Sequence, residues 1–166
     1  MLEGLDSVAW SSFAQPDWNT ADEVPRALLA LAVSDSQQTA DAAYQRTLHA
    51  FGNNHAGTYY PVVVPALPFL GQILAEGGDW PRLATLEVLL DLLLSFEPAA
   101  GYEIVGSPGI DERELRALVF AGATELWSTI RPFANASGSQ RIRQLAMEVL
   151  ETIHDGPPPT TGRNPD

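Results

Sequence analysis

Apolar residues recur at three- and four-residue intervals along most of the chain, which is the spacing of one face of an α-helix. A first helix is predicted over the apolar run 27–33, with Asp22 as its N-cap. Residues 34–36 end this helix and cap a second one. Gly52 and Asn53 are expected to end the second helix, because both residue types tolerate the left-handed backbone of a helix end.

The stretch 58–65 permits two interpretations. Its tyrosine and valine residues favour a strand. Prolines at positions 61, 65 and 68 are incompatible with a central strand, and the apolar residues 67–74 continue at helical spacing. We therefore expect a kinked third helix that begins near residue 58, with a strand as the alternative.

Gly77 and Gly78 end the third helix, and Asp79 is placed to cap the fourth. The fourth helix is apolar around nearly its whole surface, so we expect it at the centre of the packed helices. Segment 97–110 contains three glycines and two prolines and is predicted to be one long internal loop.

Two signals mark the start of the fifth helix. Asp111 and Glu114 have the spacing of a capping box, and Ile110 and Leu115 occupy the positions of a hydrophobic staple. The apolar face then continues, so one helix is expected, and Pro132 together with residues 135–138 is expected to end it.

A sixth helix is predicted after Ser139, with an apolar face over residues 142–153. Residues 156–166 are rich in proline and have almost no apolar side chain to bury, so we expect a disordered tail. The predicted organisation is one helical domain over residues 1–155, followed by this tail.

Six amphipathic helices joined mostly by short loops form three hairpins, which begin near residues 22, 58 and 111. Once the long loop is subtracted, the interval between hairpins lies in the range of two-helix solenoid repeats. A single hairpin cannot bury its apolar stripe, whereas three stacked hairpins share a continuous core. The sequence therefore predicts an all-α fold, a short right-handed α-solenoid of three helical hairpins. A closed six-helix bundle is the alternative.

Four segments carry a resemblance to a known group of proteins. They are LDSVAWSSF at 5–13, EVP at 23–25, NHAGTYYP at 54–61 and VPALPFL at 64–70. In these segments the chain resembles the HEAT/armadillo-like repeat proteins of actinomycetes, over about residues 5–150. It departs from the usual His-Gln-Gly-Thr pattern at Ala56, and Pro65 adds a second helix breaker. The resemblance implies a HEAT-like helical stack and no activity that can be transferred.

The chain has 166 residues, 45% of them hydrophobic, and a formal charge of −12 from 21 acidic and 9 basic residues. This charge opposes binding to a phosphate backbone, so we do not expect a nucleic-acid partner. All basic residues are arginines, which excludes lysine Schiff bases and P-loop lysines. The chain has no cysteine, which excludes thiolate nucleophiles and disulfides. The amino-terminal residues do not resemble a targeting signal, and the apolar stretches are shorter than a membrane span. We therefore expect a cytoplasmic protein that does not contact a membrane.

His49, His55 and Asp41 are the candidates for a metal site. A zinc pair on a helix requires histidines three or four residues apart, and His55 follows the helix end. We therefore favour a structural role, in which Asn54 and His55 bond the open carbonyls of the second helix. Segment 101–107 copies the spacing of a phosphate-binding loop but has serine where lysine is required. We predict no cofactor and no metal.

The second helix of each predicted hairpin carries polar residues at helical spacing. These residues are Asp41, Gln45 and His49 on the second helix, Glu87 and Asp91 on the fourth, and Gln144, Glu148 and Glu151 on the sixth. Because the second helices of stacked hairpins line the concave surface, we expect an acidic groove. Residues 1–110 hold 13 acidic residues and 3 arginines, so negative charge is concentrated in the first two hairpins. Such a charge attracts a cationic partner, and it also serves solubility.

We predict a non-enzymatic protein-interaction module whose acidic groove binds a basic protein or peptide; an inhibitor or immunity-type protein is one form of such a module. The alternative is an enzyme or small-molecule carrier, similar to a lyase, on the same scaffold. The pocket of such an enzyme would be built from the aromatic residues Tyr59, Tyr60, Trp80 and Tyr102.

Overall fold

The structure is a computed structural model that describes residues 2–106, 111–135 and 139–157. Seven α-helices dominate these residues. They are α1 (Glu23–Ala32), α2 (Gln37–Phe51), α3 (Val63–Glu76), α4 (Asp79–Leu90), α5 (Leu115–Glu125), α6 (Trp127–Ala134) and α7 (Gln140–Asp155). The shorter elements are the 3₁₀ turns η1 (Leu5–Ser7) and η2 (Trp10–Ser12), the π-helical turn η3 (Asp91–Ser95), and the strands β1 (Gly52–Asn53), β2 (Thr58–Tyr59), β3 (Glu97–Pro98), β4 (Ile104–Val105) and β5 (Arg113–Glu114). The prediction of a mostly helical fold is confirmed.

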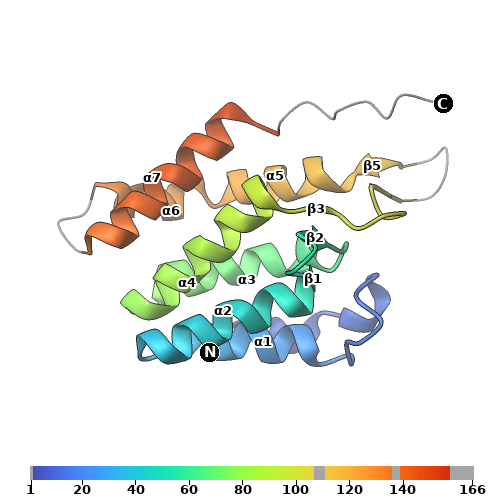
Figure 1. Cartoon of the computed structure of the whole chain (residues 1–166), viewed down its shortest axis with the longest axis horizontal. Helices are drawn as coiled ribbons and strands as arrows, with labels where there is room; N and C mark the ends of the chain where they lie inside the picture. Colours follow the sequence, from blue (N-terminus) through green and yellow to red (C-terminus); the bar gives the residue numbers. More distant parts are fainter. Residues whose placement is uncertain (1, 107–110, 136–138, 158–166) are drawn as a thin grey trace.

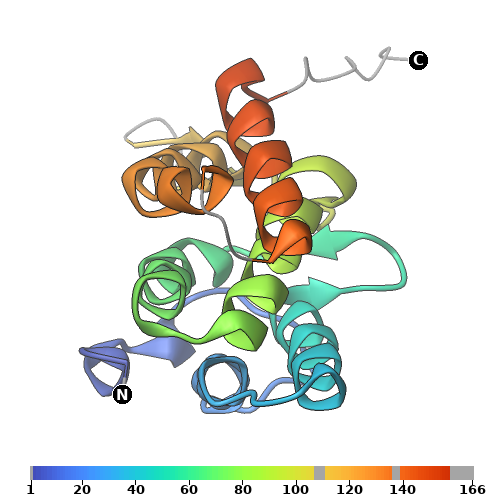
Figure 2. The same ribbon diagram turned by 90° about the vertical axis from the view of Figure 1, so that its left-hand side faces the viewer.

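The helices pack in two layers (Figure 1). In one layer α2, α4 and α7 lie side by side, with α4 in the middle. In the other layer α3 contacts α1, α5 and α6. Between the layers α1 packs on α2, α3 on α4 and α6 on α7 (Figure 2). The predicted central position of the fourth helix is confirmed, because α4 contacts helices of both layers and fully buries Leu86, Val88 and Leu89.

One hydrophobic core connects the described helices, from Leu5 in η1 to Ile153 in α7. The amino-terminal segment covers α3, where the Trp10 ring packs on Phe69 with centroids 5.8 Å apart. Glycine allows close packing of α3 on the neighbouring helices, since a Cβ at Gly71 would lie 2.7 Å from Leu126 Cδ2. The two layers therefore share a single densely packed interior.

The stretch 58–65 contains both of the structures considered for it. Residues 58 and 59 form β2, which pairs antiparallel with β1 and parallel with β3. The Ala99 N–H donates a hydrogen bond of 2.8 Å to the Tyr59 carbonyl, which ties β2 to β3. The third helix begins at Val63, so its predicted start near residue 58 is wrong. Pro61 prevents extension of the strand because it has no N–H to donate.

The segment predicted as one long loop supplies two strands. β3 follows η3 after one residue, and β4 pairs antiparallel with β5, with Ile104 opposite Glu114. The prediction is therefore wrong for residues 97–98 and 104–105, while residues 107–110 lie outside the described part of the chain. Strands of two residues are too short for an alternating hydrophobic pattern, so their pairing depends on segments distant in sequence.

Two of the predicted helix caps are confirmed. Ser36 forms a capping box at the start of α2, and the Ser139 hydroxyl accepts a backbone hydrogen bond at the start of α7. Asp22 occupies the N-cap position of α1 as predicted, but its carboxylate pairs with the arginine one turn later and makes no capping hydrogen bond. Asp79 is the first residue of α4, and the preceding glycine holds the N-cap position.

Gly52 ends α2 as predicted, but for a different reason. Its φ is 177°, which is extended backbone rather than the left-handed conformation of a helix end. A Cβ at Gly52 would overlap the backbone carbonyl of Thr58 in β2. The close approach of β1 to β2 is therefore what requires glycine at this position.

The helix predicted between Asp111 and Pro132 is two helices with a later start. Glu114 holds the N-cap position of α5 without a side-chain capping bond, so the predicted capping box is wrong. Ile110, the first half of the predicted staple, lies outside the described residues. The chain turns at Leu126, and Pro132 lies inside α6. The helix ends at Ala134 with Asn135 as its C-cap, so the predicted end is confirmed at Asn135 and wrong at Pro132.

Candidate functional site

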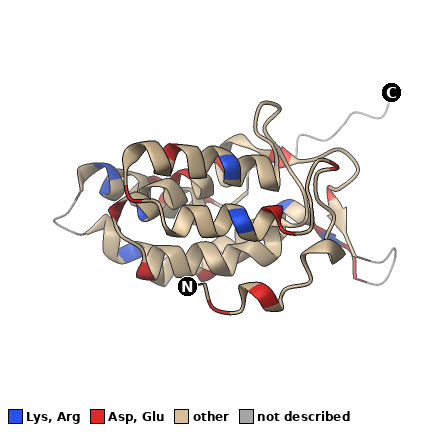
Figure 3. Ribbon diagram, turned by 90° about the horizontal axis from the view of Figure 1, so that it is seen from below, with Lys and Arg blue, Asp and Glu red and all other residues tan. Residues whose placement is uncertain are grey.

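The predicted site residues lie in the layer formed by α2, α4 and α7. Asp41, Gln45 and His49 are on α2, Glu87 is on α4, Asp91 begins η3, and Gln144, Glu148 and Glu151 are on α7. Acidic residues and arginines are interspersed along the chain when the molecule is viewed from below (Figure 3). The contacts of each residue therefore decide where negative charge is available to a partner.

Asp91 joins two helices. The Tyr44 hydroxyl, from α2, donates a hydrogen bond to the Asp91 carboxylate at the end of α4. Burial, together with this hydrogen bond and the negative charges of Asp91 and Glu87, raises the pKa of Tyr44 above its ordinary value. Asp91 is thus part of the contact between α2 and α4, and its carboxylate already has a hydrogen-bond partner within the protein.

Glu87 joins α4 to α7. Its Oε1 lies 3.2 Å from Nη2 of Arg141, in the first turn of α7. The Glu87 side chain is 26% exposed, and that of Arg141 is 52% exposed. Arg141 compensates the charge of Glu87. Both carboxylates predicted on the fourth helix, Glu87 and Asp91, therefore already have a partner within the protein.

The polar residues of α2 contribute little net charge. Gln45 accepts a hydrogen bond of 2.9 Å from the Asn54 amide. The His49 ring stacks on Trp18 with centroids 5.2 Å apart and an interplanar angle of 20°. Asp41 is exposed and has no side-chain partner among the described residues. This part of the predicted groove is therefore polar rather than strongly acidic.

The open carbonyls at the end of α2 are bonded by the amino-terminal segment. Trp18 Nε1 donates to the His49 carbonyl at 3.2 Å, and Asn19 Nδ2 donates to the Ala50 carbonyl at 2.7 Å. The expectation that Asn54 and His55 would make these bonds is wrong, because the β1–β2 turn directs them elsewhere. Trp18 and Asn19 come from 31 residues earlier in the chain, a distance over which no local signal operates.

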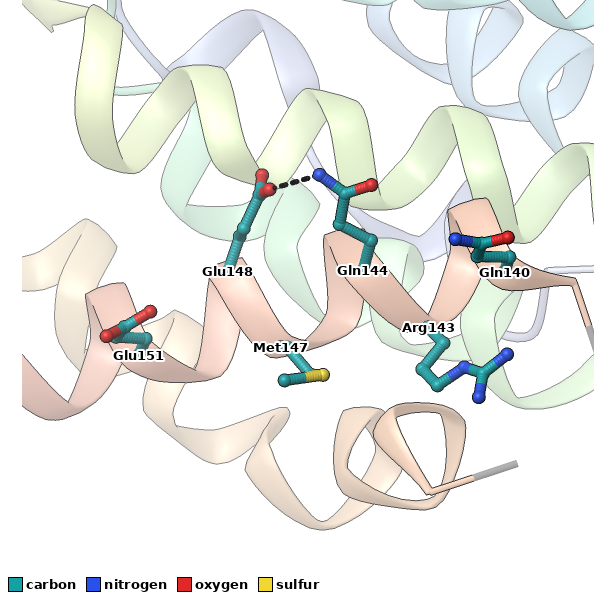
Figure 4. A pocket seen from close by; sticks show the side chains of 6 residues that line it. All are labelled: Gln140, Arg143, Gln144, Met147, Glu148 and Glu151. Atoms are coloured by element: carbon teal, nitrogen blue, oxygen red, sulfur yellow. Dashed lines mark hydrogen bonds between the residues drawn. The ribbon is translucent and has the colours of Figure 1, made fainter. Parts of the chain in front are cut away.

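Glu148 and Glu151 lie on the outer face of α7, which also carries Arg143. This face borders a shallow hollow of about 640 Å³, and in Figure 4 Gln144 and Glu148 point toward α4 and are joined by a hydrogen bond of 2.9 Å. Among the described residues, no arginine pairs with Glu148, Glu151 or Asp155. Asp155 was not among the predicted residues, although it continues the series one turn after Glu151.

A second hollow, of about 490 Å³, lies between η3 and the end of α7. Its lining consists of Leu93, Leu94, Glu148, Glu151, Thr152, Asp155, Gly156 and Pro157. Leu94 is 59% exposed at this site. The apolar spacing of the predicted fourth helix does not distinguish Leu94 from the buried leucines, because spacing gives no indication that a packing partner is missing.

The candidate metal and aromatic sites do not assemble. Within residues 2–106, 111–135 and 139–157, no group of three or more histidine, aspartate and glutamate side chains is placed to hold a metal ion. The Tyr60 and Tyr102 rings pack together at 4.9 Å, and Tyr59 is fully buried near the strands, whereas Trp80 lies at the start of α4. These four aromatic residues therefore do not converge on one pocket.

Tyr59 is buried in a polar cluster with Arg116, which is also buried, and Glu97, whose side chain is exposed beside the short sheet. Arg116, on α5, is buried and donates from Nη1 to Glu97 Oε1 at 2.7 Å. Burial raises the pKa of Tyr59 above its ordinary value, with Arg116 opposing and Glu97 reinforcing this shift. The ion pair connects β3 to α5, so this cluster ties the segment after η3 to the helices.

Among the described residues, no helix combines the length and the apolar composition needed to cross a membrane. Comparison with family models, curated proteins and solved structures finds no match to this chain. The resemblance to HEAT/armadillo-like proteins thus stays a prediction from the sequence segments that carry it.

Proposed function

We propose that this protein is a non-enzymatic interaction module, a short HEAT-like helical solenoid that binds a basic protein or peptide. The order of helix contacts supports the solenoid, since α1 and α2 pack on α3 and α4, and these pack in turn on α5, α6 and α7. The partner surface is the carboxyl-terminal half of α7 together with the neighbouring end of α4. This location replaces the broader groove over three helices, because Glu87 and Asp91 are engaged by Arg141 and Tyr44.

The observation that carries the proposal is the set of unpaired carboxylates on α7. Glu148, Glu151 and Asp155 follow one another at three- and four-residue steps, so their like charges repel one another. They also lie toward the carboxyl end of α7, where the helix dipole already places negative partial charge. A cationic partner relieves both repulsions, and this provides a physical reason for the surface to bind one.

The test compares two charge-neutralised variants of the whole chain. One variant carries the site substitutions Glu148→Gln, Glu151→Gln and Asp155→Asn. The matched control carries Glu76→Gln, Glu112→Gln and Glu125→Gln, which neutralise three exposed carboxylates elsewhere. Both variants have the same net charge, so a difference between them reports the position of the charge and not its amount.

Each protein is used to capture partners from a lysate at low and at high ionic strength, followed by mass spectrometry. We expect the unmodified chain and the control to retain the same basic protein at low salt, and the α7 variant to lose it. Equal retention by both variants would show that α7 is not the binding surface. A small molecule retained in native mass spectrometry, with no protein captured, would favour the carrier alternative.

A further inference from the structure

The hollow between η3 and α7 combines an apolar floor with an acidic rim. Leu94 forms the accessible floor and is exposed over more than half of its surface, whereas Leu93, which also borders the hollow, is fully buried. Glu148, Glu151 and Asp155 form the rim on the α7 side. Its volume of about 490 Å³ is enough for several side chains of a partner, within the ordinary range of binding clefts.

The π-helical turn η3 helps to leave Leu94 without a packing partner. The Phe96 N–H donates to the Asp91 carbonyl at 2.9 Å, a bond that spans five residues and ends α4 in a widened turn. The chain then leaves the layer as β3, so no further helical residue of α4 covers Leu94. Leu94 is thus placed by η3 at the edge of the cleft.

The charge of the rim determines which occupant is complementary. The three rim carboxylates have no arginine partner among the described residues. The rim carboxylates repel an anionic occupant. A neutral apolar occupant removes water from these carboxylates without supplying a positive charge, which costs free energy. A segment with an aliphatic side chain between lysine or arginine residues satisfies the floor and the rim together.

We propose that this cleft binds an aliphatic side chain of a basic peptide segment, with the flanking cations of that segment contacting Glu148, Glu151 and Asp155. This inference rests on the proposed function and specifies the chemistry of its partner. The aliphatic contact with Leu94 selects among basic partners, since an acidic rim alone accepts any cation.

The experiment uses two labelled synthetic peptides with the whole chain. One peptide combines leucine and arginine residues, and the other has serine in place of every leucine. The protein variants are Leu94→Asn and the control Val33→Asn, which changes a residue 75% exposed at the end of α1. Both positions are exposed, and circular dichroism verifies that both variants remain folded.

Fluorescence anisotropy measures the affinity of each pair. We expect Leu94→Asn to weaken binding of the leucine-containing peptide by roughly tenfold or more, from the loss of one buried aliphatic contact. Val33→Asn should bind this peptide as the unmodified chain does. The serine peptide should bind the unmodified chain and both variants with equal, lower affinity.

The outcomes separate this inference from the proposed function. If Leu94→Asn binds the leucine peptide normally while the neutralised α7 variant does not, the acidic surface binds cations and the aliphatic subsite is refuted. If the neutralised α7 variant also binds both peptides normally, the proposed function and the inference are both wrong. Equal weakening by Val33→Asn would likewise refute a specific role for this cleft.

Discussion

The hydrogen bond between Tyr44 and Asp91 is expected to stabilise the fold, and this expectation can be tested directly. The substitution Tyr44→Phe removes only the hydroxyl that donates to Asp91. The phenylalanine ring retains the contacts of the half-buried tyrosine ring, so the change isolates the bond between α2 and α4. Its result decides whether Asp91 serves the structure or the surface.

The magnitude follows from the chemistry of the pair. A hydrogen bond to a charged acceptor contributes about 1.5–3 kcal/mol. Both side chains are partly exposed to water, which screens the charge, so we expect a loss of about 1–2 kcal/mol. Since each kcal/mol shifts the Tm of a protein of this size by about 2–4 °C, the expected decrease in Tm is about 2–8 °C.

The assay is urea unfolding of the unmodified chain, Tyr44→Phe, Asp91→Ala and the double variant. The control is Tyr102→Phe, because the Tyr102 hydroxyl makes no hydrogen bond with any of the described residues. We expect the double variant to be more stable than additivity predicts, by about 1 kcal/mol, because each single change already breaks the same bond. A coupling energy below about 0.3 kcal/mol would show that the two side chains do not stabilise the layer together.

Two further predictions concern the strand contact and the buried tyrosines. Gly52→Ala should destabilise the fold by about 3 kcal/mol in urea unfolding, because its Cβ overlaps the Thr58 carbonyl. Gly78→Ala meets no atom within 4 Å and should cost only about 1 kcal/mol, from the loss of a favourable N-cap residue. Equal effects would refute the close-approach argument. The pKa of Tyr44 and of Tyr59 is raised in the folded state, so the unfolded chain releases these protons first. Stability should be unaffected below about pH 9 and should fall above about pH 10, by roughly 1.4 kcal/mol per pH unit for each tyrosine, and Tyr44→Phe should make the loss less steep.

The candidate site illustrates what local pattern can and cannot predict. Helical spacing placed Glu148 and Glu151 on one exposed face of α7, and this placement depends only on residues within the same helix. It gave no information about the partners of Glu87 and Asp91, because Arg141 and Tyr44 lie 54 and 47 residues away. Distant ion pairs and hydrogen bonds become visible only when the helices that carry them are packed.

The same limit explains the errors in the elements. The strands β2 and β3 are two residues long, so their backbone pairing, rather than any hydrophobic alternation, makes them strands. The apolar series after residue 115 continues without a gap in spacing, yet the chain turns at Leu126, whose side chain packs against Gly71 of α3. In both places a contact from another segment decided the backbone conformation.

By itself, the sequence determined the mostly helical character of this protein, the caps at Ser36 and Ser139, and the central place of the fourth helix. These features follow from hydrophobic spacing and side-chain to backbone bonds within a few residues. Tertiary structure alone decided which carboxylates are engaged, why Gly52 is required, and that Leu94 borders a cleft. Those outcomes depend on distances between segments, which a linear pattern of residues does not contain.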